Sequence, residues 1–174
     1  MNPRDIADSA WAFGQMFEKP SAEFLRLWYA SFKRDYMQFP AKSLSSSLWA
    51  FARLDLKPSS AFLERWYEAF EEKKASFGGA QLAQSLWSFG KLRIDPEESF
   101  LESWVVEFDR KLDTFRPVQL AQMIWALARL GIRPRQNFID SWNAQFLKSV
   151  GNLDNVSSSM RHGQPIAEYS VWSN

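Results

Sequence analysis

Residues 81–92 read QLAQSLWSFGKL, and this stretch decides the fold. Its apolar residues follow the spacing of one helix face, as Leu82 and Leu86 show. Closely related stretches occur once before it and once after it, SLSSSLWAFARL at 43–54 and QLAQMIWALARL at 119–130. The chain is therefore predicted to repeat one amphipathic helix, which we call helix A.

A second apolar-periodic stretch follows each helix A. In the third copy it reads ESFLESWVVEFDRKL, residues 98–112, and places Phe100, Trp104 and Phe108 on one face; we call it helix B. A proline precedes each copy: Pro20, Pro58, Pro96 and Pro134. We expect this proline in the first turn of helix B, where its missing N–H costs no hydrogen bond. Each A–B pair is therefore predicted to form a helical hairpin.

Two series of tryptophans each recur at intervals of 38 residues, without an insertion between repeats. The first series is Trp11, Trp49, Trp87 and Trp125, and the second is Trp28, Trp66, Trp104 and Trp142. Repeats of this kind bury their apolar faces against their neighbours. We predict an all-α, right-handed α-solenoid of four hairpins, spanning residues 3–40, 41–78, 79–116 and 117–154. Residues 155–174 are expected to form a tail that is flexible or folds back as a cap through Ile166 to Trp172.

The composition argues against several classes of function. The chain has no cysteine, and its one histidine, His162, lies outside the repeats. Without a nucleophile–base pair or a Gly-rich phosphate loop, we expect no enzyme, no metal site and no cofactor. No apolar run approaches the roughly 18–20 residues of a membrane span, so no membrane insertion is expected. The first repeat starts almost at once, and no targeting peptide is expected in this chain.

The aromatic series allow two interpretations. Aromatic side chains can stack on nucleic-acid bases, which contributes about 1–3 kcal/mol per base. However, these residues lie on the apolar stripes of their own helices, so the sequence favours core packing for both tryptophan series.

The predicted solvent face of helix A carries the candidate binding residues. One polar set, the polar row, consists of Asp8, Ser46, Gln84 and Gln122, and a neighbouring set consists of Asp5, Ser43, Gln81 and Gln119. A further set consists of Ala12, Ala50, Ser88 and Ala126. The cation row consists of Arg53, Lys91 and Arg129, with Lys57, Arg93 and Arg133 in the adjacent corners. In repeats two to four, helix A contains no acidic residue, although the whole chain has a net charge of only +1.

This separation of charge suggests a division of labour on helix A. Short polar side chains can hydrogen-bond base edges, so Asp8, Ser46, Gln84 and Gln122, together with Ser43, Gln81 and Gln119, are candidate RNA-base contacts. The cation row and the three corner residues are candidate phosphate contacts. The alternative is that small residues line helix A because it forms a crowded wall, and that the basic row is incidental.

The repeat resembles the octotricopeptide repeat, a 38-residue helical hairpin. The resemblance rests on the three helix-A stretches quoted above and on the P-x-x-x-F-L-x-x-W pattern of helix B, and it covers residues 3–154. The chain departs from the family in one respect, because phenylalanine occupies positions 24, 62, 100 and 138, where members typically have tryptophan. The resemblance implies binding of single-stranded RNA or rRNA in a chloroplast or mitochondrion, in transcript maturation, stability, translation or a ribosome.

A structural role remains the alternative to RNA binding. The same solenoid could serve as a protein–protein scaffold in a large organellar complex. Four repeats would also read only about four nucleotides if each reads one. The first helix keeps apolar Ile6, Trp11 and Phe13 in the pattern of an internal repeat. We therefore expect its outer side to dock against a protein partner or further repeats.

Overall fold

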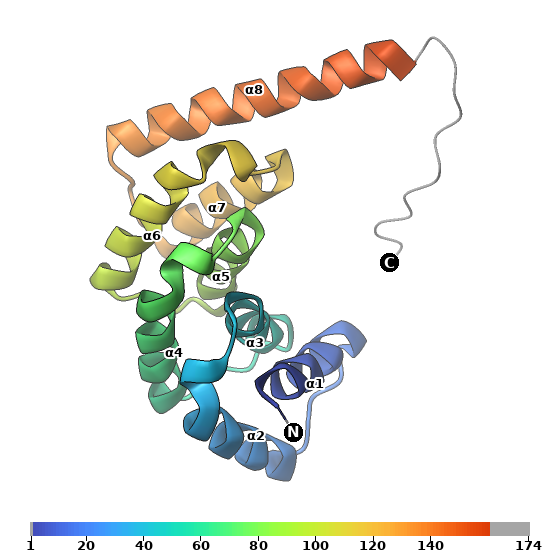
Figure 1. Ribbon diagram of the computed structural model, residues 1–174, viewed down its shortest axis with the longest axis vertical. Helices are drawn as coiled ribbons and strands as arrows, with labels where there is room; N and C mark the ends of the chain where they lie inside the picture. Colours follow the sequence, from blue (N-terminus) through green and yellow to red (C-terminus); the bar gives the residue numbers. More distant parts are fainter. Residues whose placement is uncertain (1, 161–174) are drawn as a thin grey trace.

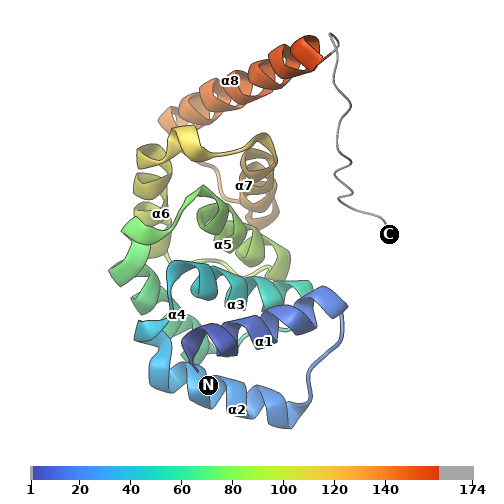
Figure 2. The same ribbon diagram turned by 45° about the vertical axis from the view of Figure 1, so that its right-hand side comes forward.

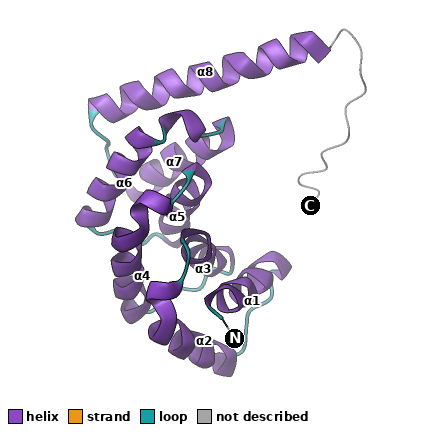
Figure 3. Cartoon of the chain, viewed as in Figure 1, coloured by secondary structure: helices purple, strands orange, loops and turns teal. Residues whose placement is uncertain are grey.

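The computed structural model describes residues 2–160, and these residues form helices and short connections without a strand (Figure 3). The helices A are α1 (Pro3–Met16), α3 (Ala41–Arg53), α5 (Gly79–Leu92) and α7 (Pro117–Leu130). The helices B are α2 (Ala22–Asp35), α4 (Ser60–Lys73), α6 (Glu98–Arg110) and α8 (Gln136–Met160). Short 3-10 helices, η1 (Tyr36–Gln38), η2 (Lys74–Ser76) and η3 (Leu112–Thr114), follow α2, α4 and α6.

The helices are arranged in two rows. The A helices pack directly side by side in the order α1, α3, α5, α7, and the B helices follow the outer arc (Figures 1 and 2). The predicted α-solenoid of helical hairpins is confirmed. Because α3 and α5 are each flanked by two neighbours in the row, their free surface is a narrow stripe.

One hydrogen bond recurs in every hairpin and explains the second tryptophan series. The indole N–H on helix B donates to a main-chain carbonyl of the preceding helix A. The pairs are Trp28 to Ile6 (2.8 Å), Trp66 to Leu44 (2.9 Å), Trp104 to Leu82 (3.0 Å) and Trp142 to Leu120 (3.0 Å). The bond fixes the position of helix B along helix A while the ring fills the core. The predicted core role of this series is confirmed for Trp28, Trp66 and Trp104, which are buried.

Aromatic rings also join successive hairpins. Tyr67 stacks on Phe89 with 5.6 Å between ring centroids, and Phe70 lies 4.7 Å from Phe100 of the next hairpin. The Tyr67 hydroxyl accepts a hydrogen bond from the main-chain N–H of Glu97 at 3.4 Å. Burial raises the pKa of Tyr67 to about 12. The junction between repeats is therefore an apolar contact with one polar anchor at its edge.

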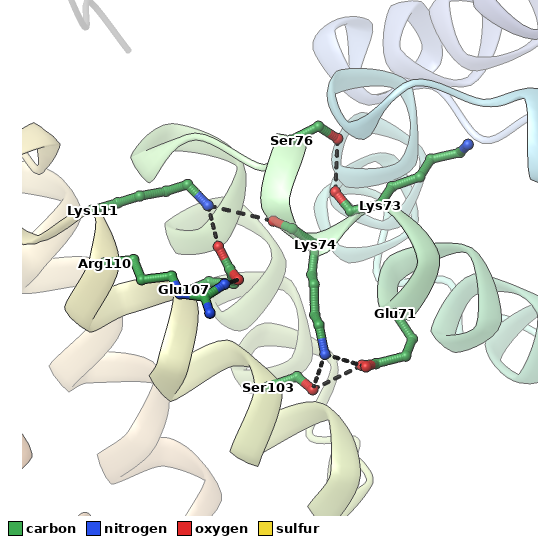
Figure 4. A network of polar contacts seen from close by, with 8 residues as sticks. All are labelled: Glu71, Lys73, Lys74, Ser76, Ser103, Glu107, Arg110 and Lys111. Atoms are coloured by element: carbon green, nitrogen blue, oxygen red, sulfur yellow. Dashed lines mark hydrogen bonds and ion pairs between the residues drawn. The ribbon is translucent and has the colours of Figure 1, made fainter.

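Polar contacts connect the B helices along the outer arc (Figure 4). Glu71 at the end of α4 pairs with Lys74, and both contact Ser103 of the next helix B. Glu107 is buried, with 1% of its side chain exposed, and it pairs with Arg110 and Lys111. Both carboxylates therefore make structural contacts among the B helices, on the opposite side from the acid-free helices α3, α5 and α7.

The proline of each hairpin lies two residues before the first residue of helix B, and not in its first turn as predicted. Helix α2 begins at Ala22 and α4 at Ser60, so Pro20 and Pro58 precede the N-cap residue and are not in the first turn. The N-caps are Ser21 and Ser59, whose hydroxyl groups accept hydrogen bonds from the main-chain N–H groups three residues later. A serine cap satisfies a free N–H, which a first-turn proline would only remove.

Helix α8 extends beyond the predicted end of the fourth repeat. It continues to Met160, so residues 155–160 are helical and not part of a separate tail. The breakers that end the earlier hairpins, such as Pro40 and Gly78, have no counterpart here, since Asp154 and Asn155 occupy the equivalent positions. The rest of the predicted tail, including His162 and the cap from Ile166 to Trp172, lies outside the described residues.

Candidate nucleic-acid interface

The residues predicted to contact bases at the start of the A helices instead make hydrogen bonds within their own helices. These residues occupy the third position of their helices, where a side chain can reach back to the N-cap N–H. Gln81 Oε1 accepts a hydrogen bond from the Gly78 N–H at 3.1 Å, and Gln119 Oε1 accepts one from the Arg116 N–H at 2.9 Å. Asp5 does the same for Asn2 in α1. These side chains cap their own helices.

The exception in this set follows from its N-cap residue. In α3 the N-cap is Pro40, which has no N–H to donate. The Ser43 side chain therefore has no cap hydrogen bond to accept, and it is buried instead. Ser43 is 5% exposed and Gln119 is 6% exposed. The prediction that Ser43 and Gln119 face solvent is wrong, because the start of each A helix lies against its neighbour in the row.

The predicted exposure is also wrong for a second set on helix A. Ala50, Ser88 and Ala126 are buried. They lie where the A helices cross closely: a Cβ added to Gly14 would approach Ala50 Cα to 3.3 Å, and one added to Gly90 would approach Ala126 Cα to 2.8 Å. Small residues recur at one position of helix A, Gly14, Ala52, Gly90 and Ala128, which predicts that neighbouring helices cross closely there. This prediction is confirmed at Gly14 and Gly90. The free stripe is thereby narrowed to the polar row, the cation row and the residues between them.

The polar row lies on this stripe. Asp8 is exposed, and Ser46, Gln84 and Gln122 are partly exposed. Within the described residues, no hydrogen bond involves the side-chain amide of Gln84 or of Gln122, so both amides can bind a ligand. In this respect they differ from Gln81 and Gln119, whose carbonyl groups are occupied by the helix caps.

The three residues of the cation row differ in how accessible they are. Lys91 and Arg129 are exposed, about two turns beyond the polar row. Arg53 is partly buried, and its guanidinium carbon lies 4.1 Å from the centroid of the Phe17 ring and 5.7 Å from that of Trp49. Arg53 is therefore engaged by aromatic rings at the end of the first hairpin, while Lys91 and Arg129 are available.

The three corner cations are exposed but differ in their surroundings. Arg93 follows α5 in a left-handed conformation with φ of 53° and ends that helix. Lys57 lies in the corresponding corner between α3 and α4. Arg133 lines a groove of about 530 Å³ between α6 and the start of α8, together with Glu98 and Glu102. The structure therefore does not place Arg133 in an acid-free region.

The first tryptophan series differs from the second: its predicted core role is wrong for Trp11 and Trp125, whereas Trp49 and Trp87 are partly buried and pack against the core. This indole row consists of Trp11, Trp49, Trp87 and Trp125. Trp11 is 42% exposed and Trp125 is 43% exposed, and Trp49 and Trp87 are partly exposed. Each lies three residues after a polar-row residue, and Trp49, Trp87 and Trp125 also lie four residues before a member of the cation row. This spacing keeps the three kinds of residue on one helix face. The apolar stripe of helix A thus extends to the free surface.

Two further classes of site are absent from the described part of the chain. Residues 2–160 contain no group of three or more His, Cys, Asp or Glu side chains that could hold a metal ion. None of their helices is long and apolar enough to cross a bilayer.

Residues 23–158 match the family described as the Tbc2 translation factor, N-terminal domain. The chain belongs to this family. The match begins in α2 and ends in α8, so it includes α3, α5 and α7 with their acid-free faces. A comparison with curated proteins finds no match. The Tbc2 family associates this domain with translation.

The sequence contained signals for two features of this Tbc2-family domain that the prediction missed. Each tryptophan of the first series lies three residues after a polar-row residue and so shares its helix face, which is the signal for the exposure of its ring. The contact of Phe17 with Arg53 could have been found from the pattern as well. Phe17 takes the corner position that Asp55, Arg93 and Gly131 occupy in the other repeats, so an aromatic residue there is the exception.

Proposed function

We propose that this Tbc2-family domain binds single-stranded RNA along the free stripe of its A helices and acts in organellar translation or transcript maturation. The observation that carries the proposal is the alignment of unoccupied amides with exposed cations on α5 and α7, which contain no acidic residue. Gln84 and Lys91 lie on α5, and Gln122 and Arg129 repeat the arrangement on α7. Base edges are read by amides, and phosphates are held by cations. The translation-factor family supports the same conclusion.

The proposed contacts are narrower than the sequence alone suggested. Lys91 and Arg129, with Arg93 and Lys57 at the corners, hold phosphates, and Ser46, Gln84 and Gln122 read bases. Asp8 occupies the equivalent position in α1, where its negative charge opposes phosphate. Gln81, Gln119 and Ser43 are left out because their side chains cap helices or are buried. Arg133 is left out because of the carboxylates beside it.

The domain acts by binding and not by catalysis, and its place of action is the chloroplast or mitochondrion. Both statements rest on the residues and on the resemblance to octotricopeptide repeats. Detection of the protein in purified chloroplasts or mitochondria, with an antibody against residues 2–160, tests the second statement. Recovery exclusively in the cytosolic fraction would contradict it.

Charge reversal of the cation row tests RNA binding directly. In the Lys91→Glu/Arg129→Glu variant, affinity for a labelled single-stranded RNA of mixed sequence should fall steeply. The slope of log K against log salt should become shallower by about 1.4, because each lost phosphate contact contributes about 0.7. The matched control is Arg26→Glu/Lys33→Glu on α2, which changes the net charge equally on the outer row. Equal losses in both variants would show that the stripe of A helices is not the binding site.

A scaffold function is the second candidate, favoured by apolar exposure at the first hairpin. Met16 and Phe17 are 59% and 61% exposed, and Trp11 lies on the same helix. A protein partner or further repeats docked on α1 would cover them. If the domain binds no RNA but forms a complex that the Trp11→Ser variant loses, the scaffold function is the correct one.

A further inference from the structure

The indole row lies between the two sets of residues proposed to contact RNA. On α5 the order is Gln84, Trp87, Lys91, and on α7 it is Gln122, Trp125, Arg129. Residues at this spacing share one helix face. The partial exposure of Trp87 and the 43% exposure of Trp125 leave part of each ring open to solvent. α5 and α7 thus each present an amide, an aromatic ring and a cation in succession.

The indoles of the third and fourth repeats are also close to one another. The rings of Trp87 and Trp125 stack with 6.3 Å between their centroids and 28° between their planes. At the other end, a Cβ added to Gly14 would lie 3.1 Å from Cζ3 of Trp49, so this ring rests against the backbone of α1. Glycine at position 14 is what allows that approach. The close crossing of α5 and α7 thus brings two indoles of the row, Trp87 and Trp125, into contact.

We infer that the indoles of Trp87 and Trp125 form a stacking platform for bases of a single RNA strand, on the parts of the two rings that do not face each other. This inference rests on the proposed function and assigns to Trp87 and Trp125 the contact with the faces of the bases. A single strand exposes the faces of its bases, as a paired duplex does not, and proteins bind such strands by aromatic stacking beside a cationic groove. Gln84 and Gln122 lie on one side of the rings to reach base edges, and Lys91 and Arg129 lie on the other side to reach phosphates.

The charge of the surroundings favours RNA over a protein partner for this row. Exposed tryptophans are also common at protein–protein contacts. However, α3, α5 and α7 contain no acidic residue, and Lys42, Arg53, Lys91 and Arg129 are their charged residues. A surface with cations and unoccupied amides around its aromatic rings is complementary to a polyanion with flat bases.

Aromatic substitutions separate stacking from charge. Trp87→Leu/Trp125→Leu keeps apolar volume but removes the flat rings, whereas Trp87→Phe/Trp125→Phe keeps a ring at each position. With a labelled single-stranded RNA of mixed sequence, we expect the Leu variant to bind at least tenfold more weakly, since one stacked base contributes roughly five- to 150-fold. The Phe variant should recover most of the affinity. The salt slope should stay as in the wild type, because no cation has changed.

The matched control is Val106→Ala on α6, which removes exposed apolar surface from the outer row and should bind as the wild type does. Thermal melting by circular dichroism shows that each variant is folded, and the Phe variant provides the test if the Leu variant is not. Quenching of tryptophan fluorescence by RNA should decrease in the Leu variant. Wild-type affinity in both double variants would overturn the stacking role and leave RNA binding standing. A wild-type domain that does not bind RNA would overturn the proposed function and this inference together.

Discussion

The indole N–H of Trp66 donates a hydrogen bond of 2.9 Å to the main-chain carbonyl of Leu44, and the ring itself is fully buried. Replacement by phenylalanine removes the donor and part of the buried ring. We expect Trp66→Phe to lower the free energy of unfolding by about 2–3 kcal/mol, combining the lost hydrogen bond with incomplete filling of the space. Chemical denaturation followed by circular dichroism measures the change.

Trp142→Phe is the matched comparison, because Trp142 makes the same bond to Leu120 but is only partly buried. Trp142→Phe should lower the free energy of unfolding by less than Trp66→Phe does, since water can reach the site and fill the vacated volume. An unchanged stability of Trp66→Phe would contradict the role given to this bond.

The fold could be predicted from sequence because every local signal repeated with the same period. Apolar spacing and prolines recur once in each repeat, and breakers end the first three, so independent copies support one hairpin. Even so, the sequence did not show that the second tryptophan series bonds across the hairpin. A periodic position identifies the face of a helix, but the acceptor on the partner helix depends on how the two helices are aligned.

The candidate site was predicted less completely, for a related physical reason. Helical periodicity places Gln81 and Gln84 on neighbouring parts of one face, and it cannot distinguish an amide that caps its own helix from a free one. The distinction depends on the N-cap N–H and on how closely α3, α5 and α7 approach one another. The same close approach buries Ser88 and leaves Trp125 at the surface.

The crossing of α5 and α7 should be intolerant of any added atom at Gly90. A Cβ there would lie 2.8 Å from Ala126 Cα and 3.0 Å from its Cβ. Alanine favours helix by about 1 kcal/mol over glycine, but the two backbones must separate to accept it. We expect Gly90→Ala to destabilise the protein by about 1–2 kcal/mol in chemical denaturation.

Gly151→Ala on α8 provides the control, since a Cβ at this position meets nothing within 4 Å. This variant should be neutral or more stable, by up to about 1 kcal/mol. A Gly90→Ala protein more stable than the wild type would show that the crossing is looser than the structure indicates.

Glu107 should make stability depend on acid pH. Burial raises the pKa of Glu107, but the Lys111 and Arg110 side chains lower it more, so the net direction is downward from its ordinary value. A carboxylate with a lowered pKa in the folded protein stabilises it above the pKa of the unfolded chain, about 4.3, and this contribution is lost as the pH falls. Glu107→Gln should therefore lower the free energy of unfolding by about 1–3 kcal/mol at pH 7. This difference from the wild type should shrink below about pH 4.

Glu71→Gln serves as the comparison, because Glu71 pairs with Lys74 while 54% of its side chain is exposed. Its cost should stay within about 0.5 kcal/mol, as for other exposed ion pairs. Denaturation curves at pH 7, 5 and 3.5 measure both variants. Equal costs for Glu107 and Glu71 at pH 7 would mean that burial adds nothing to the Glu107 contacts.

Arg53 should contribute less to RNA binding than Lys91, although both belong to the cation row. Its guanidinium lies over Phe17 and near Trp49, and Arg53 Nε is buried without a hydrogen-bond partner among the described residues. Leaving the rings would cost about 0.5–2 kcal/mol of cation–π attraction, which opposes a phosphate contact. We therefore expect Arg53→Gln to leave the salt slope of RNA binding nearly unchanged, whereas Lys91→Gln makes it shallower by about 0.7.

Release of Arg53 completes this test. Phe17 adopts a left-handed conformation with φ of 56°, so Phe17→Asn removes the ring with a residue that tolerates this backbone. In that background the freed Arg53 should reach a phosphate, the slope should steepen by about 0.7, and Arg53→Gln should now reverse the change. Fluorescence anisotropy at four salt concentrations measures each slope. If Arg53→Gln in the wild-type background makes the slope shallower by as much as Lys91→Gln does, the guanidinium leaves Phe17 on binding, and the division of the cation row is wrong.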